Sequence, residues 1–410
     1  MSRMSRWSFR AGGGAVAALL FTACGEPTGS SGPSVAPGSP VTSAAKAPAD
    51  RQVPASVEWN GIARGLVAKN RSSVFVAFRT YATMSVAQLE ALRAAERASS
   101  GSKGKSVSRR AAIAAASAVA LSYVYPAEGP TLEALVREQV ESDEWLERGR
   151  VDAAAGEAVG RAAGAEAVER ARTDRYFDPW TGTVPTGPGV WFSSTNPPTA
   201  PVGPAIGAAR TWFLSSGDQF RPPPPPAFGS PEFLAALAEV RQISDTRTPE
   251  QDSIAKFWAF PAGTYTPPGY WNEEASALAL RYHLNERRAA RLLAILNMVA
   301  MDAIIASHEA KYTYWLIRPS QADQAITLSM PLPNFPAYPS NHATISGAMA
   351  EVLAAAFPSQ ADRLRAAADQ AALSRVYGGI HYRFDGTAGL ALGRRIARYA
   401  IGKDAGGHRH

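Results

Sequence analysis

Three short segments between Lys311 and Asp385 carry residue types that suit the binding of a tetrahedral oxyanion. In the first, KYTYWLIRP, Arg318 follows Lys311 after an interval of seven residues. That interval is about two turns of helix, so a helix that continues through Ile317 would place both cations on one face. Pro319 has no amide hydrogen, and we expect it to end the helix.

The second segment, YPSNHATISGAMAEVLAAAF, predicts a helix that begins close to Ser340, Asn341 and His342. The first amides of a helix have no internal acceptors, and the helix dipole is positive at that end. A hydroxyl, free amides and an imidazole at a helix N-terminus therefore suit an anion. We expect this turn to form an oxyanion cradle.

In the third segment, SRVYGGIHYRFDGTAG, Arg375 leads through two glycines to His381, and Asp385 follows four residues later. The glycines allow the backbone to bend close to a ligand. The spacing allows the Asp385 carboxylate to hold one ring nitrogen of His381 and leave the other free. This pattern predicts an oriented nucleophile or metal ligand.

Three cations, Lys311, Arg318 and Arg375, would be costly to hold together without an anion. We therefore expect the site to bind phosphate, vanadate or sulfate. His381 is suited to attack phosphorus or to ligate vanadium, and His342 is suited to transfer protons. The remaining histidines are interpreted as packing or tail residues: His283, His308, His408 and His410.

The ordered set K-x(6)-R-P, P-S-x-H and S-R-x(5)-H-x(3)-D resembles a known three-part signature. It is the signature of the superfamily that joins vanadium-dependent haloperoxidases to type 2 phosphatidic acid phosphatases and bacterial non-specific acid phosphatases. The usual second part is P-S-G-H, and Asn341 stands here in place of the glycine. Asparagine keeps the backbone amide and is the non-glycine residue that best tolerates a positive φ. We expect Asn341 in place of glycine to affect the affinity for the anion or the substrate preference.

The resemblance implies one site with two alternative chemistries. In a haloperoxidase, vanadate would bind to His381, and His342 would assist the hydrogen peroxide that oxidises halide. In a phosphatase that needs no cofactor, His381 would form a phosphohistidine, while His342 would protonate the leaving alcohol and then activate water. Asp385 would orient His381 in both. The oxyanion-binding residues implied are Lys311, Arg318, Ser340, Asn341, Arg375 and His381.

We favour the haloperoxidase-like branch, because the chain length and the helical region ahead of the signature resemble its bacterial members. Acid phosphatase activity is the alternative. A third interpretation is an oxyanion-binding lipoprotein without catalysis. It is less favoured because binding an anion does not require Asp385 or His342. The expected small-molecule substrates are peroxide and halide, or a phosphomonoester.

The elements that must position these residues are predicted to be helical. Hardly any stretch alternates with period two, which indicates an all-α fold. The resemblance implies a helical bundle with the anion site near its helix ends. Helices are expected at residues 60–98, 110–124, 130–172, 231–258, 272–309 and 386–402.

Two stretches have a distinct composition. Residues 173–231 are rich in Pro and Gly and include FRPPPPPAFGSP, which we interpret as a rigid polyproline II connection in preference to a partner motif. LLAILNMVAMDAIIASHEAKY is apolar around most of its circumference, but Asn297 and Asp302 interrupt it too often for a membrane span. It predicts a core helix that leads into Lys311.

The chain divides into four predicted regions. Residues 1–24 place three arginines before a short apolar run and end at the only cysteine, Cys24, which is typical of a lipoprotein signal. Residues 25–55 are rich in Gly, Pro, Ser and Ala and predict a disordered tether. An N-terminal helical region, 56–230, would then precede a C-terminal region, 231–403, that contains the anion site.

These regions and the composition indicate an exported protein. A lipid on Cys24 would anchor it to a membrane surface, and cleavage without lipid would release it. One cysteine excludes an intrachain disulfide. The net charge of +7 is modest for 410 residues and lies partly in the leader and the anion site, so no nucleic-acid partner is expected.

Overall fold

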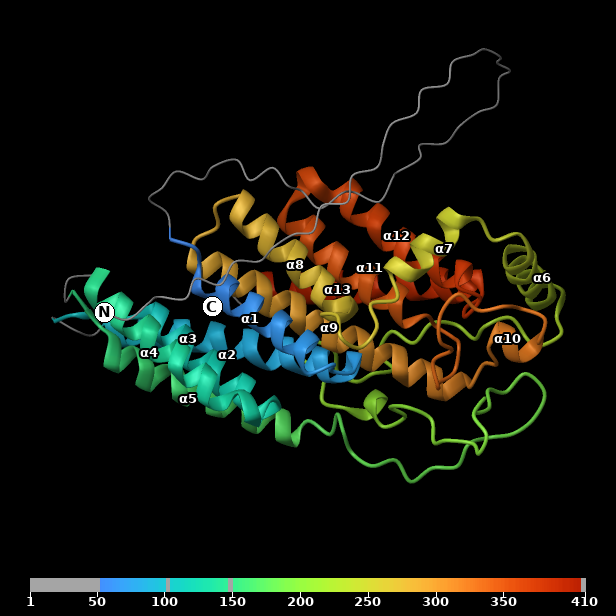
Figure 1. Ribbon diagram of the computed structural model, residues 1–410, viewed down its shortest axis with the longest axis horizontal. Coiled ribbons are helices and arrows are strands. Elements are labelled where there is room, and N and C mark those ends of the chain that lie inside the picture. Colours follow the sequence, from blue (N-terminus) through green and yellow to red (C-terminus); the bar gives the residue numbers. More distant parts are fainter. Residues whose placement is uncertain (1–51, 101–103, 147–149, 407–410) are drawn as a thin grey trace, which may run out of the picture. The chain divides into compact units, whose positions relative to one another are not determined.

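The computed structural model describes residues 52–100, 104–146 and 150–406 (Figure 1). These residues belong to one compact unit. The expected signal, Cys24, most of the tether, and the tail histidines His408 and His410 lie outside the described residues.

Regular structure in the described residues is almost entirely helical, which confirms the predicted all-α fold. The N-terminal half contains α1 (Ala55–Lys69), α2 (Val74–Ser100), α3 (Arg109–Val124), the 3-10 helix η1 (Pro126–Glu128), α4 (Gly129–Leu146) and α5 (Ala153–Thr173). Two short strands, β1 (Ser106–Val107) and β2 (Val151–Asp152), pair in parallel. Helices α2, α3 and α5 pack on one another around a core rich in alanine.

The Pro- and Gly-rich stretch after Thr173 has one short element, the 3-10 helix η2 (Ile206–Ala208). Its proline run lies against the C-terminal half of the chain. The Tyr314 hydroxyl donates a 2.7 Å hydrogen bond to the Pro222 carbonyl, and the Tyr338 hydroxyl donates one of 2.7 Å to the Pro223 carbonyl. The run is therefore packed against the fold at these two carbonyls.

The C-terminal half supplies the remaining helices. They are α6 (Pro231–Thr246), α7 (Pro249–Phe257), α8 (Thr266–Arg281), α9 (Glu286–Tyr314), α10 (Pro319–Ala322), α11 (Asn341–Ala356), the 3-10 helix η3 (Pro358–Gln360), α12 (Ala361–Tyr377) and α13 (Arg383–Gly406). Helix α11 packs against both α12 and α13.

Helix α9 is the central helix of the fold. It contacts α2 from the N-terminal half and α11 from the C-terminal half, and Figure 1 shows it in orange between the blue and red helices. Among the described helices it alone is long and apolar enough to cross a membrane, yet 83% of its most apolar window is buried inside the fold. Its polar interruptions are also satisfied: Asn297 exchanges hydrogen bonds with Asn272, and Asp302 accepts from the Trp212 and Phe213 amides.

Candidate active site

The segment between Lys311 and Arg318 leaves the helix earlier than expected. Helix α9 ends at Tyr314, so the prediction that it continues through Ile317 is wrong. Trp315 adopts the left-handed conformation, with φ 49°. Its carbonyl accepts a 2.7 Å hydrogen bond from the Trp191 amide, and Ile317 donates one of 2.9 Å to the Gly189 carbonyl. The backbone has therefore exchanged helical hydrogen bonds for bonds to a distant segment.

Pro319 likewise has a different role from the predicted one. It begins α10 at the first helical position and does not end α9. Lys311 and Arg318 still approach one another, because both cations lie over the ring of Phe335. The ring centroid is 5.2 Å from Lys311 Nζ and 5.1 Å from Arg318 Cζ.

Lys311 is fully buried. Its ammonium donates hydrogen bonds to three backbone carbonyls, those of Pro336 (2.8 Å), Ala337 (2.7 Å) and Pro339 (2.6 Å). Burial lowers the pKa of Lys311 well below its ordinary value, and the nearby charge of Arg318 lowers that pKa further.

Arg318 is also fully buried, and its guanidinium faces His381. Nε donates to the Phe335 carbonyl at 3.0 Å, and Nη1 donates to the Ile380 carbonyl at 2.8 Å and to His381 Nε2 at 3.0 Å. Nη2 is buried and has no hydrogen-bond partner in the described part of the chain. Burial lowers the pKa of Arg318 to about 10.

Arg375, near the end of α12, is held by side-chain and backbone acceptors. Nε donates to Ser374 Oγ at 2.9 Å, Nη1 donates to Met330 Sδ at 2.9 Å, and Nη2 donates to the Ala255 carbonyl at 2.7 Å. Burial lowers the pKa of Arg375 to about 9. Each guanidinium nitrogen of the Nη pair keeps a second hydrogen for a further acceptor.

The predicted helix start at Ser340 is confirmed. Ser340 is the N-cap of α11, and its Oγ accepts a long hydrogen bond of 3.5 Å from the Ala343 amide. Within the described residues, neither the Asn341 nor the His342 amide has an acceptor. The Ser340 amide donates to the Asp385 carbonyl at 3.0 Å, which joins this turn to the third segment.

Asn341 occupies its place without a positive φ. It is the first residue of α11 and is absent from the described residues that have positive φ. Its carboxamide is buried and lies between two residues of α9, accepting from the Ser307 hydroxyl at 2.7 Å and donating to His308 Nε2 at 3.1 Å. The side chain is therefore accommodated by contacts on α9.

His381 and Asp385 make the predicted contact. His381 Nδ1 lies 2.8 Å from Asp385 Oδ2, which also accepts from the Tyr382 amide at 3.0 Å. Because the Arg318 guanidinium can only donate, Nε2 of His381 is an acceptor and Nδ1 carries the proton. Burial and then the charges of Arg318 and Lys311 lower the pKa of His381 well below its ordinary value. The ring is neutral, with its lone pair on Nε2.

Asp385 is the one carboxylate among the ten signature residues, and it is fully buried. Burial raises its pKa to about 7, although the neighbouring charge of Lys311 opposes that rise. Its second oxygen, Oδ1, has no hydrogen-bond partner within the described ranges. The buried cations that act on this carboxylate are Lys311 and Arg318.

His342 is the most exposed of the signature residues, being half-buried where the others are buried. Its Nε2 donates to the Trp258 carbonyl at 3.0 Å, which leaves the lone pair on Nδ1. Burial and then Arg375, Arg318 and Lys311 lower the pKa of His342 well below its ordinary value. These interactions place the imidazole within the same cluster of charges.

The sequence interpretation missed two residues that touch this cluster. His308, interpreted as a packing residue, is fully buried but also accepts a hydrogen bond from Asn341. A signal was present, because His308 precedes Lys311 by three residues and so shares its helix face. Met330, which contacts Arg375, lies in an irregular segment, and no sequence pattern marks it.

Known proteins are similar to the part of the chain that contains this site. The family model described as the PAP2 superfamily matches residues 291–403, a range that contains all ten signature residues. Residues 291–403 are therefore similar to the PAP2 superfamily, and we call this matched region the PAP2 domain. Vanadium chloroperoxidase from Curvularia inaequalis is 28% identical over 150 residues, which cover 29% of this chain and only 25% of that protein's length.

Solved structures extend the similarity of fold beyond the PAP2 domain. A bacterial vanadium-dependent iodoperoxidase superposes with a TM-score of 0.74 at 22% identity, covering 86% of this chain and 97% of that chain. The apo form of a bacterial vanadium-dependent chloroperoxidase gives a TM-score of 0.61 at 14% identity, covering 80% and 92%. The chain has the all-α fold of the vanadium haloperoxidases.

The residues of the PAP2 domain fit an oxyanion such as vanadate. Arg318 Nη2 is a buried donor without a partner, the two amides that open α11 are also available, and His381 Nε2 presents a lone pair. An anion among Lys311, Arg318 and Arg375 would offset the cost of burying their charges. These hydrogen-bond donors and the imidazole of His381 are the groups that would hold vanadate.

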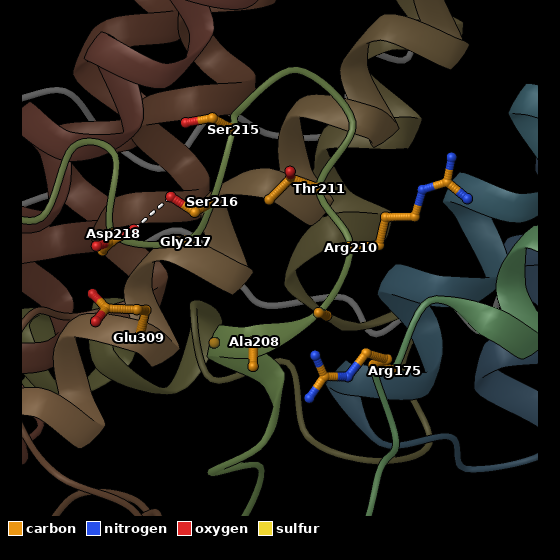
Figure 2. A pocket seen from close by; sticks show the side chains of 11 residues that line it. Arg175, Ala208, Arg210, Thr211, Ser215, Ser216, Gly217, Asp218 and Glu309 are labelled. Carbon is orange, nitrogen blue, oxygen red and sulfur yellow. Dashed lines mark hydrogen bonds between the residues drawn. The ribbon is translucent and has the colours of Figure 1, made fainter.

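A separate pocket of about 340 Å³ lies on another part of the fold. Figure 2 shows it between Arg175 and Arg210 on one side and Asp218 and Glu309 on the other. None of the ten signature residues lines it.

Proposed function

We propose that this protein is a vanadate-dependent haloperoxidase, which oxidises halide with hydrogen peroxide at a vanadate held by His381. The observation that carries the proposal is the state of the His381 ring. Its Nδ1 proton is committed to Asp385, and its Nε2 lone pair faces the Arg318 guanidinium inside a buried group of cations. A neutral imidazole whose Nε2 carries no proton is a suitable vanadium ligand.

The fold supports the haloperoxidase over the phosphatase. The similarity to the iodoperoxidase spans 86% of this chain, including the N-terminal helices that lie outside the PAP2 domain. Bound vanadate would supply the activation of hydrogen peroxide toward halide. Arg318, Arg375 and Lys311 would stabilise its negative oxygens, and the amides at the start of α11 would donate to it.

His342 would transfer protons at this site. Its Nε2 proton is held by the Trp258 carbonyl, so Nδ1 is the nitrogen that is free to accept a proton. Because burial and the neighbouring cations keep the ring neutral, it can take a proton from peroxide and return it to a product oxygen. His342 is partly exposed, and we expect substrate to approach the site from its side.

Phosphomonoester hydrolysis is the second candidate, because the same unprotonated His381 Nε2 is also a nucleophile. The ester phosphorus would be attacked by Nε2, and His342 would protonate the leaving alcohol and then activate water to release phosphate. The PAP2 domain supports this alternative. Oxyanion binding without catalysis is a third and weaker candidate.

A paired assay distinguishes the candidates. The purified full-length protein is tested for halogenation of a dye with orthovanadate, peroxide and bromide or iodide, and for hydrolysis of p-nitrophenyl phosphate without vanadate. We expect halogenation that depends on vanadate, and its loss in His381→Ala but not in His283→Ala, which removes an exposed histidine. Hydrolysis that vanadate inhibits, without halogenation, would establish the phosphatase instead.

We also propose that the protein is exported and anchored through a lipid on Cys24. The proposal rests on the arginine-rich leader and the single cysteine at its end. Intact protein expressed in bacteria should partition into detergent, and Cys24→Ala should partition into the aqueous phase. Equal partitioning of the two proteins would contradict a lipid anchor.

A further inference from the structure

Asn341, which stands where the resembling signature has glycine, is tied to helix α9 by a chain of hydrogen bonds. The Ser307 hydroxyl donates to Asn341 Oδ1 at 2.7 Å, and Asn341 Nδ2 lies 3.1 Å from His308 Nε2. His308 Nδ1 lies 2.9 Å from the Gly203 carbonyl. Ser307 and His308 are fully buried, and Asn341 is 7% exposed.

The direction of every hydrogen bond in this chain is determined by the Gly203 carbonyl, which can only accept. His308 must therefore carry its proton on Nδ1 and accept at Nε2. The amide nitrogen of Asn341 then donates to His308, and its amide oxygen accepts from Ser307. Burial lowers the pKa of His308 to about 3, so the ring stays neutral and keeps this arrangement.

The His308 ring is itself held in place from several sides. Phe75 packs on it edge-on at 5.0 Å between ring centroids, and Phe335 lies 5.7 Å away. Gly203 has φ 73°, and a Cβ there would lie 3.1 Å from His308 Cε1, so a larger residue would press on the ring. A fixed imidazole can position the group that is bonded to it.

The group that His308 positions is Asn341, which lies at the start of the oxyanion cradle. Asn341 is the first residue of α11, and neither its amide nor that of His342 has an acceptor among the described residues. Lys311 lies on α9 one turn beyond Ser307 and His308. The same helix therefore holds both a cation of the site and the side chain that fixes the start of α11.

We propose that His308 is a positioning residue for oxyanion binding, which acts through the Asn341 side chain on the first turn of α11. The inference rests on the proposed oxyanion site and extends it. It assigns a specific role to Asn341. Asn341 and His308 act as a pair, so each residue contributes fully to anion affinity only when the other is present.

A double-mutant cycle tests the pair. The dissociation constants of orthovanadate and of inorganic phosphate are measured by calorimetry for the full-length wild type, His308→Ala, Asn341→Gly and the double variant. We expect His308→Ala to weaken binding about tenfold when Asn341 is present and less than about twofold in the Asn341→Gly background. His308→Gln, which can accept from Asn341 and donate to Gly203, should recover a measurable part of the loss.

Asn297→Ala is the matched control, because it removes another buried, hydrogen-bonded side chain from α9 away from the cluster. It should lower the melting temperature and leave anion affinity unchanged. Equal weakening by His308→Ala in both backgrounds would overturn the positioning role and assign His308 to packing alone. A wild-type protein that binds neither anion would overturn the proposed function and this inference together, whereas binding without coupling overturns the inference only.

Discussion

Arg318 Nη1 donates a 3.0 Å hydrogen bond to His381 Nε2, the ring nitrogen that is turned away from Asp385. A guanidinium and a histidine would repel one another if the ring were protonated, so this contact requires a neutral imidazole. The nucleophilic or ligating nitrogen, His381 Nε2, therefore lies next to the N–H donors of the Arg318 guanidinium. A ligand bound at Nε2 would therefore also contact the Arg318 guanidinium.

Arg318→Lys should weaken phosphate binding, because a lysine offers a point charge in place of the fork that spans the backbone carbonyls and His381. The expected loss of binding free energy is about 1.5–3 kcal/mol, the range for hydrogen bonds to charged groups. Calorimetry measures it. Arg241→Lys, at an exposed ion pair, is the control and should bind phosphate like the wild type.

Asp385→Asn should release the His381 ring from its present tautomer. An amide nitrogen facing Nδ1 would favour a proton on Nε2, where the ligating lone pair now lies. Vanadate affinity should fall by about 10–100-fold, as is usual when the partner of a ligating histidine is removed. Unchanged affinity in a folded variant would show that Asp385 does not orient the ring.

His342→Gln should separate chemistry from binding. Glutamine can keep the hydrogen bond to the Trp258 carbonyl but cannot transfer a proton, so turnover should fall by about 10²–10⁴-fold. The dissociation constant of vanadate, measured separately, should change little. A loss of affinity as large as the loss of turnover would mean that His342 serves binding.

Anion binding should become weaker as the pH rises. Burial lowers the pKa of Lys311 well below 10.5, so its charge is lost at a lower pH than usual, whereas a bound anion favours the charged form. Binding should therefore take up protons at pH values above the lowered pKa of Lys311. Calorimetry with molybdate in buffers of different ionisation enthalpy measures this uptake, which Lys311→Gln should reduce.

Gly393→Ala should destabilise the fold and displace the cradle. A Cβ at Gly393 would lie 2.0 Å from the Thr344 carbonyl oxygen, so α13 and α11 would have to separate. The expected cost is about 1–3 kcal/mol, as for other overpacked sites. Gly402→Ala in the same helix meets nothing within 4 Å and should instead stabilise by about 0.4–1 kcal/mol. Urea unfolding compares the two variants, and similar effects from both would contradict this role of helix packing.

Several features of the site could be predicted from the sequence because they depend on residues close together in the chain. The four-residue spacing of His381 and Asp385 led to the observed contact. Ser340 caps the helix that follows it, as hydroxyl side chains do at helix starts. The all-α fold followed from helical periodicity over long stretches.

Other features required the tertiary structure. The end of α9 at Tyr314 depends on hydrogen bonds to residues 189 and 191, more than a hundred residues earlier in the chain. The hydrogen bonding of the Asn341 side chain depends on His308, which lies on a different helix. Local patterns state which residues prefer a helix or can bind an anion, but long-range packing decides where a helix ends and which buried partner a polar group finds.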